Sequence, residues 1–346
     1  MPFAEQTEAI ELENGQSIVV EKLSYSSVRI NAAPPSGTFE PPRSPARIRF
    51  ATPEGRTGKI AFGPGSDVIF TVELAGRNVQ ALLDSGASVS HIDVDLARAI
   101  GLQGTGAFQA PGTSGATVAV QAAECPPITI DSMTVSGLRV GLTDLAPARA
   151  SIGRPVEVIL GQDIFDHVVV EIDFGAGRVA FVEPARYRPA AGTRSLPIGR
   201  VGFVPTVQVE FEDIGPADFA LDLGNAAAPL VIYGSFWKPR EMLTRRPWST
   251  TMSADIAGPR EVKQASVSTV VFAGWTFRDL PALFVDLDKG KGSERLAGNI
   301  GLPILDRFTL AFDYPSSRLY LSPNASIERP FASAGILPWS VAAYTA

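Results

Sequence analysis

An apolar, strand-like run that ends at an aspartate followed two residues later by a glycine occurs twice in this chain of 346 residues. The first copy is VQALLDSGAS at 79–88, and the second is FALDLGN at 219–225. Such a run is typical of a buried strand that stops at a tight turn. A carboxylate at that place is costly unless it is hydrogen-bonded, so Asp84 and Asp222 are the candidate functional residues.

Two further landmarks repeat in the same order. The segment VILGQDIF at 158–165 returns as AGNIGLPIL at 297–305, and VVVEIDFGAGRVAF at 168–181 returns as FTLAFDYPSSRLYL at 308–321. Equivalent positions lie 138 residues apart at the two aspartates and 140 apart at the other two landmarks. An ordinary turn explains a single Asp-Ser-Gly, but three landmarks in one order indicate an internal duplication.

These motifs carry a family resemblance. An apolar run into LLDSGAS at 82–88, a helix-like LARAIGL at 96–102, a glycine-rich segment and ILGQD at 159–163 resemble a retropepsin-type aspartic protease. Two such units in one chain resemble the bilobal, pepsin-like aspartic proteases, and the resemblance covers residues 47–322. It implies an all-β fold, mainly β with short helices, in which two barrel-like lobes of an acid-protease fold are related by a pseudo-two-fold axis.

The resemblance assigns Asp84 and Asp222 as a catalytic pair at the bottom of a cleft shared by the lobes. Two adjacent carboxylates cannot both ionise, so they share a proton and their pKa values separate. The ionised member takes a proton from a bound water while the protonated member hydrogen-bonds the substrate carbonyl. This chemistry requires no metal or organic cofactor, so none is expected.

Four neighbouring residues are expected to support this pair. Gly86 and Gly224 lack a Cβ atom and so let the two turns approach closely. In the family a hydroxyl after each aspartate bonds to the opposing loop, a role that Ser85 fits and Leu223 does not. Asn225 is expected to compensate by donating its amide to the outer oxygen of Asp222.

A glycine-rich hairpin tip lies between the β-prone stretches 107–109 and 117–120. In the family a flap that closes over the substrate occupies this place, which assigns Gly112, Thr113, Ser114 and Gly115 to a flap. The corresponding segment of the second copy is 253–260, with Ala257 and Gly258 as its flap residues.

The chain is divided into five parts by composition and by the repeat. They are an N-terminal arm and Pro-rich linker (1–46), a first retropepsin-like lobe (47–184), an interlobe connection (185–194), a second, divergent lobe (195–322) and a C-terminal tail (323–346). Within the first lobe, 68–74 and 79–83 are predicted to form the hairpin that delivers Asp84, and 95–101 a short helix closed by glycine.

The amino-acid composition argues against several classes of partner. A hydrophobic content of 45% with 28 Pro and 32 Gly suits a β protein with many turns, and a net charge of −6 argues against nucleic acid as a partner. One cysteine and two histidines offer no convincing metal site. There is no run of 18 apolar residues that would span a membrane, and the given N-terminus lacks the features of an export signal, which leaves the compartment open. Because both lobes belong to one chain, a monomer is expected.

Three functions remain open at this stage. The first is an active aspartic endopeptidase that acts on peptides or proteins, favoured because both acids are present. The second is a non-catalytic homologue that binds peptides or protein partners in the same cleft, for which Leu223 is the main argument. The third, a glycosidase with two carboxylates, explains neither the Ile-Leu-Gly landmarks nor the flaps.

Overall fold

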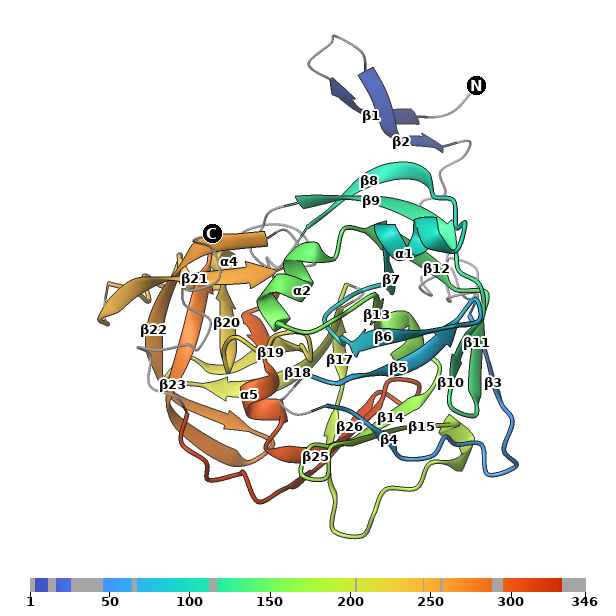
Figure 1. Cartoon of the computed structure of the whole chain (residues 1–346). Helices are drawn as coiled ribbons and strands as arrows, with labels where there is room; N and C mark the ends of the chain where they lie inside the picture. The colour runs from blue at the N-terminus through green and yellow to red at the C-terminus, as the bar shows by residue number, and fades with distance from the viewer. Residues whose placement is uncertain are drawn as a thin grey trace. The chain divides into compact units, whose positions relative to one another are not determined.

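The structure is a computed structural model that describes residues 4–11, 17–25, 46–63, 67–111, 117–202, 204–244, 246–255, 258–287 and 295–331. The chain divides into two compact units, residues 1–43 and 44–346. In the first unit β1 (Ala4–Glu11) pairs antiparallel with β2 (Ser17–Tyr25). The second unit consists of three sheets and a few short helices (Figure 1). The predicted all-β fold class is therefore confirmed, whereas the five-part division of the chain stays a prediction.

Two large sheets of the second unit carry the two aspartate turns. The first has the order β3 (Arg47–Phe50), β11 (Met133–Ser136), β10 (Ile128–Ile130), β5 (Ile69–Leu74), β6 (Arg77–Leu83), β13 (Val158–Leu160), β7 (His91–Asp93), β12 (Arg139–Thr143), β9 (Thr117–Glu124) and β8 (Thr105–Pro111). The second has the order β17 (Gly199–Val201), β18 (Val204–Phe211), β19 (Gly215–Leu221), β24 (Gly298–Ile300), β20 (Leu230–Tyr233), β23 (Trp275–Val285), β22 (Gly258–Phe272) and β21 (Trp248–Asp255).

Seven strands of one sheet correspond in order to seven of the other. The series β5-β6-β13-β7-β12-β9-β8 matches β18-β19-β24-β20-β23-β22-β21. The pairing senses also agree, because β6 with β13 and β19 with β24 are both parallel, while β13 with β7 and β24 with β20 are both antiparallel. Each aspartate therefore follows a strand that occupies the same place in its own sheet.

The third sheet contains strands from both halves of the sequence. Its order is β16 (Arg194–Pro197), β26 (Arg318–Pro323), β25 (Phe308–Asp313), β14 (Val169–Asp173), β15 (Arg178–Val182) and β4 (Ile60–Ala61). At its centre β14 and β25 pair antiparallel, with Val170 opposite Phe312. The third repeated landmark of the sequence thus joins the two halves edge to edge, and apolar side chains of these strands are buried on both faces of the sheet.

The helices are short: α1 (Val94–Ala99), α2 (Ala146–Ile152), α3 (Gln162–Phe165), α4 (Gly234–Trp237), α5 (Leu302–Leu305) and the 3-10 turn η1 (Pro184–Arg186). Helix α1, expected at 95–101, begins one residue earlier, because the Asp93 side chain accepts a hydrogen bond from the Asp95 N–H as an N-cap. Helix α2 contacts β21 and β22 of the second large sheet. In the part of the chain that the structure describes, no helix has the length and apolar character to cross a membrane.

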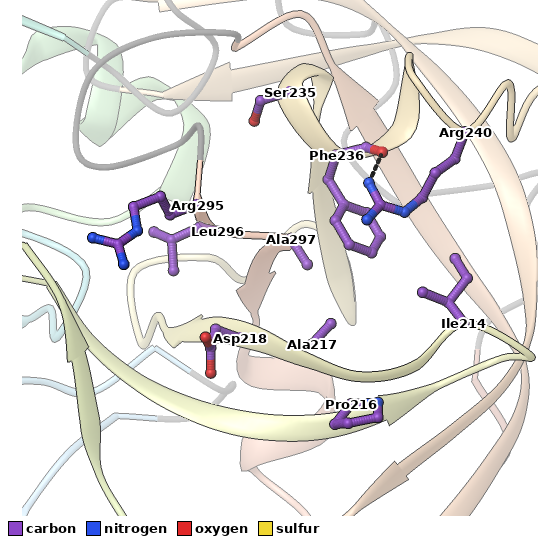
Figure 2. A pocket seen from close by; sticks show the side chains of 10 residues that line it. All are labelled: Ile214, Pro216, Ala217, Asp218, Ser235, Phe236, Arg240, Arg295, Leu296 and Ala297. Atoms are coloured by element: carbon purple, nitrogen blue, oxygen red, sulfur yellow. Dashed lines mark hydrogen bonds between the residues drawn. The ribbon is translucent and has the colours of Figure 1, made fainter.

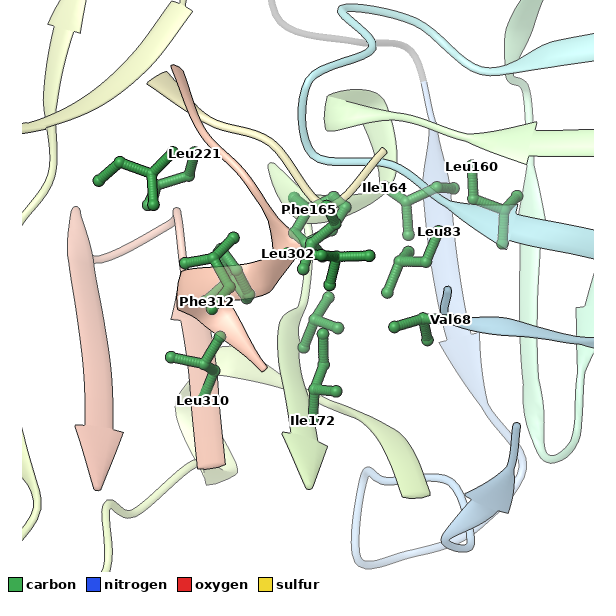
Figure 3. Close-up of a cluster of buried hydrophobic side chains, with 14 of the residues drawn as sticks. Val68, Leu83, Leu160, Ile164, Phe165, Ile172, Leu221, Leu302, Leu310 and Phe312 are labelled. Atoms are coloured by element: carbon green, nitrogen blue, oxygen red, sulfur yellow. The ribbon is translucent and has the colours of Figure 1, made fainter. Parts of the chain in front are cut away.

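The main hydrophobic core is continuous between the two halves (Figure 3). Phe165 of α3 is fully buried, and its ring centroid lies 5.4 Å from that of Phe312 on β25 and 5.4 Å from that of Tyr314. Leu221, which precedes the second aspartate, belongs to the same cluster. The strand ends that carry the carboxylates therefore pack against one apolar layer to which both halves contribute.

Replacing Phe165 by alanine should remove the centre of that layer. We expect Phe165→Ala to lower the free energy of unfolding by about 3–5 kcal/mol, the range for truncating a buried Phe. Met252→Ala, at a side chain that is 44% exposed, is the control and should change it by about 0.5 kcal/mol or less. Denaturant unfolding measures both, and equal midpoints for the two variants would contradict a core shared by the halves.

Candidate active site

The first aspartate is held at the end of β6 by its neighbouring strand. The Asp84 N–H donates to the carbonyl of Leu160 on β13 over 2.9 Å, continuing the parallel pairing of Leu83 with Leu160. The chain then turns, and the Gly86 N–H donates back to Asp84 Oδ1 over 2.8 Å. Hydrogen bonds of this kind stabilise the charged form of a carboxylate. Asp84 remains partly accessible to solvent.

The second aspartate is held in the same way. The Asp222 N–H donates to the carbonyl of Ile300 on β24 over 3.0 Å, and the Gly224 N–H donates to Asp222 Oδ1 over 3.1 Å. Asp222 is only 5% exposed, so it is the more buried of the two acids. The apolar-apolar-Asp-x-Gly pattern therefore gives the same local geometry in both halves.

Each carboxylate lies against the glycine of the opposing turn. A Cβ atom added to Gly86 would lie 2.5 Å from Asp222 Oδ1, and one added to Gly224 would lie 2.5 Å from Asp84 Oδ2. Real Cβ atoms do not approach other atoms so closely, so both positions require glycine. The structure thus brings the four residues together, each carboxylate filling the space that a side chain opposite would take.

Ser85 bridges the two turns. Its hydroxyl donates to the carbonyl of Leu221 over 2.8 Å and accepts from the N–H of Leu223 over 3.1 Å. Ser85 is 1% exposed, and its own carbonyl accepts from the Gln162 side chain over 3.0 Å. One hydroxyl of the first half therefore makes both cross-turn bonds, since the second half offers Leu223, which is fully buried in the main core.

Asn225 does not donate its amide as expected. Its Nδ2 donates to Asn299 Oδ1 over 2.9 Å, and Asn299 Nδ2 in turn donates to Asp222 Oδ2 over 2.7 Å. The residue that supplies an amide to the outer oxygen is therefore Asn299 on β24, and Asn225 acts one step further back. Sequence reasoning missed Asn299, although a polar residue in the otherwise apolar repeat 297–305 was a signal for it.

A second buried polar pair, also missed, supports the first half. Asp163 accepts from the Ser90 N–H over 2.9 Å and from the Ser90 hydroxyl over 2.6 Å, and the same hydroxyl accepts from the Gly161 N–H over 3.0 Å. Burial raises the pKa of Asp163, and the bonds from Ser90 oppose the rise. The matching residue in the second repeat is Pro303, so this pair has no counterpart there.

Two tyrosines contribute hydroxyls near the acids. Burial raises the pKa of Tyr233 on β20, the charge of Asp222 raises it further, and a hydrogen bond with Asn299 opposes the rise. Burial also raises the pKa of Tyr314, with smaller contributions from the charges of Asp222 and Asp84. Both phenols therefore stay protonated at any ordinary pH and add no charge to the site.

The expected flap residues are described only in part. Gly112, Thr113, Ser114, Gly115 and Ala257 lie outside the described residues. Gly258 begins β22, with a φ of +98° that favours glycine, and pairs with Asp255 at the end of the hairpin β21–β22. The β8–β9 hairpin occupies the corresponding edge of the first sheet.

A pocket of about 340 Å³ lies beside the second sheet (Figure 2). Its lining comes from β19 and the residue before it, from α4 and the turn after it, and from the residues before β24: Ile214, Pro216, Ala217, Asp218, Ser235, Phe236, Arg240, Arg295, Leu296 and Ala297. Arg240 lies over the Phe236 ring and donates to the Phe236 carbonyl. Neither predicted catalytic aspartate lines this pocket, so it is distinct from the site formed by the two turns.

Comparison with known proteins agrees with the first half of this site. Residues 70–164 match the family model described as aspartyl protease, a segment that contains Asp84 but not Asp222. No curated protein sequence matches the chain. Among solved structures, an aspartic proteinase from Irpex lacteus is similar, with a TM-score of 0.46 and 12% identity, over 79% of this chain and 98% of that one. The resemblance to aspartic proteases is thereby supported for 70–164, and the assignment of a second retropepsin-like copy stays a prediction.

The Ser85 bridge predicts a specific loss of stability. Ser85→Ala leaves the buried N–H of Leu223 without its acceptor, so we expect the free energy of unfolding to fall by about 1–3 kcal/mol. Ser85→Thr keeps the hydroxyl and should lose less. Thermal or denaturant unfolding of both variants measures the difference, and an alanine variant as stable as the native protein would show that the bridge is not a stabilising contact.

Proposed function

We propose that this protein is an aspartic endopeptidase in which Asp84 and Asp222 share one proton and activate a water molecule. The observation that carries the proposal is the reciprocal contact of each carboxylate with the opposing glycine. That contact favours a pair close enough to share a proton, which is the requirement of the chemistry. The match of 70–164 to the aspartyl protease model supports the same class.

In the proposed reaction the ionised aspartate removes a proton from water as its oxygen attacks the peptide carbonyl. The protonated aspartate gives its proton to the carbonyl oxygen, which forms a neutral tetrahedral diol. Return of a proton to the amide nitrogen then breaks the C–N bond and releases an amine and a carboxylic acid. The hydrogen bonds of Gly86 and Gly224 keep both carboxyl groups oriented throughout.

The substrate is a peptide or protein segment bound in a cleft covered by a flap. The hairpins β8–β9 and β21–β22 stand at corresponding edges of the two sheets and are the candidate flaps. Helix α2 contacts the second of these, which links the predicted second flap to an element of the first half. One chain would supply both acids and both flaps, which suits a monomer.

A peptide-binding homologue without catalysis is the second candidate. Leu223 favours it, because a hydrolase of this class normally has a hydroxyl at that position and this chain has a buried hydrocarbon. Cleavage of a random peptide library at acidic and neutral pH, with and without pepstatin, separates the two functions. Pepstatin-sensitive cleavage supports the endopeptidase, and peptide binding without cleavage supports the homologue.

The two acids are expected to be individually essential. Asp84→Asn and Asp222→Asn each remove a carboxylate from the pair with almost no change of shape, so each should lower kcat by about 10³-fold or more. Library cleavage measures the loss, and circular dichroism checks the fold. Activity retained by either folded variant would place the chemistry elsewhere in the molecule.

Leu223→Thr tests whether the missing hydroxyl limits activity. The change gives up about 1.5–3 kcal/mol of apolar burial for a hydrogen bond worth about 0.5–1.5 kcal/mol, so the Tm should fall. We expect kcat to rise, because the second turn regains a hydrogen bond to the first. Leu223→Val has the same shape as the threonine variant without the hydroxyl, and it should lose stability with no gain in kcat. Equal or lower kcat in both variants would show that leucine is adapted to its setting.

A further inference from the structure

Besides Ser85 and Leu223, the two halves differ at a strand position that lies beside each aspartate. Ile159 on β13 and Asn299 on β24 are equivalent, since Ile159 pairs with Leu82 and Asn299 pairs with Ala220, two residues before each acid. Ile159 packs in a small apolar cluster, whereas the Asn299 amide donates to Asp222 Oδ2. The second half therefore provides an amide donor where the first half provides a hydrocarbon.

A chain of hydrogen bonds fixes the orientation of that amide. The backbone N–H of Ala228 donates to Asn225 Oδ1 over 3.2 Å, and a backbone N–H can only donate. The Asn225 oxygen must therefore face Ala228, which turns its NH₂ group toward Asn299 Oδ1. The Asn299 oxygen is thus occupied, and its NH₂ group is directed at Asp222.

This direction constrains where a proton can reside. An oxygen that accepts an N–H over 2.7 Å cannot carry its own proton toward the same donor, because two hydrogens would then face each other. Asp222 Oδ1 accepts the Gly224 N–H over 3.1 Å, whereas Asp84 Oδ1 accepts the Gly86 N–H over 2.8 Å and the Ala87 N–H over 3.3 Å, so the backbone donors do not favour a charged Asp222. The Asn299 bond does, and it stabilises the charged form of Asp222.

Burial acts in the opposite direction, because Asp222 is the less exposed acid and desolvation favours its neutral form. A hydrogen bond to a charged acceptor is about twice as strong as a neutral one, and the low polarity of a buried site strengthens it further. We therefore expect the Asn299 hydrogen bond to outweigh the effect of burial on the pKa of Asp222. Asp84 is the charge opposite Asp222. The neutral phenols of Tyr233 and Tyr314 also interact with these acids, and the ion pair of Asp166 and Arg200 lies beside Tyr314.

We propose that Asn299 is a positioning residue that keeps the shared proton on Asp84 and leaves Asp222 as the ionised member. Under the proposed function, on which this role in catalysis rests, Asp222 is the base that takes the proton of water on Oδ1. Asp84 is the acid that protonates the carbonyl oxygen and recovers its proton when the diol collapses and Asp222 protonates the amine. The location of the proton itself does not depend on peptide hydrolysis.

The test is a pH titration by ¹³C NMR of protein labelled at aspartate Cγ, with Asp84→Asn and Asp222→Asn used for assignment. In the native protein we expect Asp222 to titrate at lower pH than Asp84. Asn299→Ile, which installs the residue of the first half, should raise the protonation constant of Asp222 by roughly 10- to 100-fold. An Asp222 that titrates above Asp84 in the native protein, or is unmoved in the folded variant, would overturn the proposal.

Two further variants keep the test decisive. Asn225→Ala removes the residue that orients Asn299 and should raise the protonation constant of Asp222 by a smaller factor. This variant provides the test if Asn299→Ile does not fold. Ser90→Ala is the matched control, because it breaks a buried hydrogen-bonded pair of the first half and should lower stability without shifting Asp222. A shift as large in Ser90→Ala as in the asparagine variants would mean that general loosening, and not the amide, sets the pKa.

Kinetics separate this proposal from the proposed function. If peptides are cleaved, the acidic limb of the kcat/KM profile should move to higher pH in Asn299→Ile, by the same factor as the NMR titration. If Asn299→Ile shifts the NMR titration of Asp222 but leaves the acidic limb of the kcat/KM profile unchanged, Asp222 is not the base. Absence of cleavage by the native protein would refute the proposed function and leave the proton location to the NMR result.

Discussion

The contact between each carboxylate and the opposing glycine is the constraint on which the rest of the site depends. Gly86 and Gly224 leave room for an acid where any Cβ atom would meet one. Two turns can approach so closely only if their strands end at matched heights. The parallel pairs β6–β13 and β19–β24 set those heights, and the antiparallel pair β14–β25 joins the two halves.

Local sequence patterns were sufficient to predict the strand ends that carry the aspartates, but not the polar side chains that hydrogen-bond to them. The β class, the hairpin before Asp84 and helix α1 follow from patterns that span a few residues, which is the range over which periodicity and turn residues act. The amide beside Asp222 comes from Asn299, 77 residues away in sequence. Its position depends on the register of two strands, and the nearby Asn225 was the only candidate that local reasoning offered.

The two halves balance burial and hydrogen bonding differently. The first keeps a hydroxyl, and Ser85 serves both a carbonyl and an N–H of the other turn. The second has the buried Leu223 at the equivalent position, which adds to the core, and it encloses its acid more fully. A more enclosed carboxylate requires more donors to remain charged; Asn299 supplies one to Asp222, and Asn225 holds Asn299 in place.

Such a difference is available only to a site made from two unequal sequences. Identical chains that meet at a two-fold axis present the same residue on both sides, so neither acid of a pair is favoured by its surroundings. In a single chain Ile159 and Asn299 can differ. Because Ala228, Asn225 and Asn299 form a one-way sequence of donors, the fold itself breaks the equivalence of the two acids before any substrate is bound. Under the proposed function, the roles of base and acid would then be fixed by the protein and not by the direction in which a peptide enters.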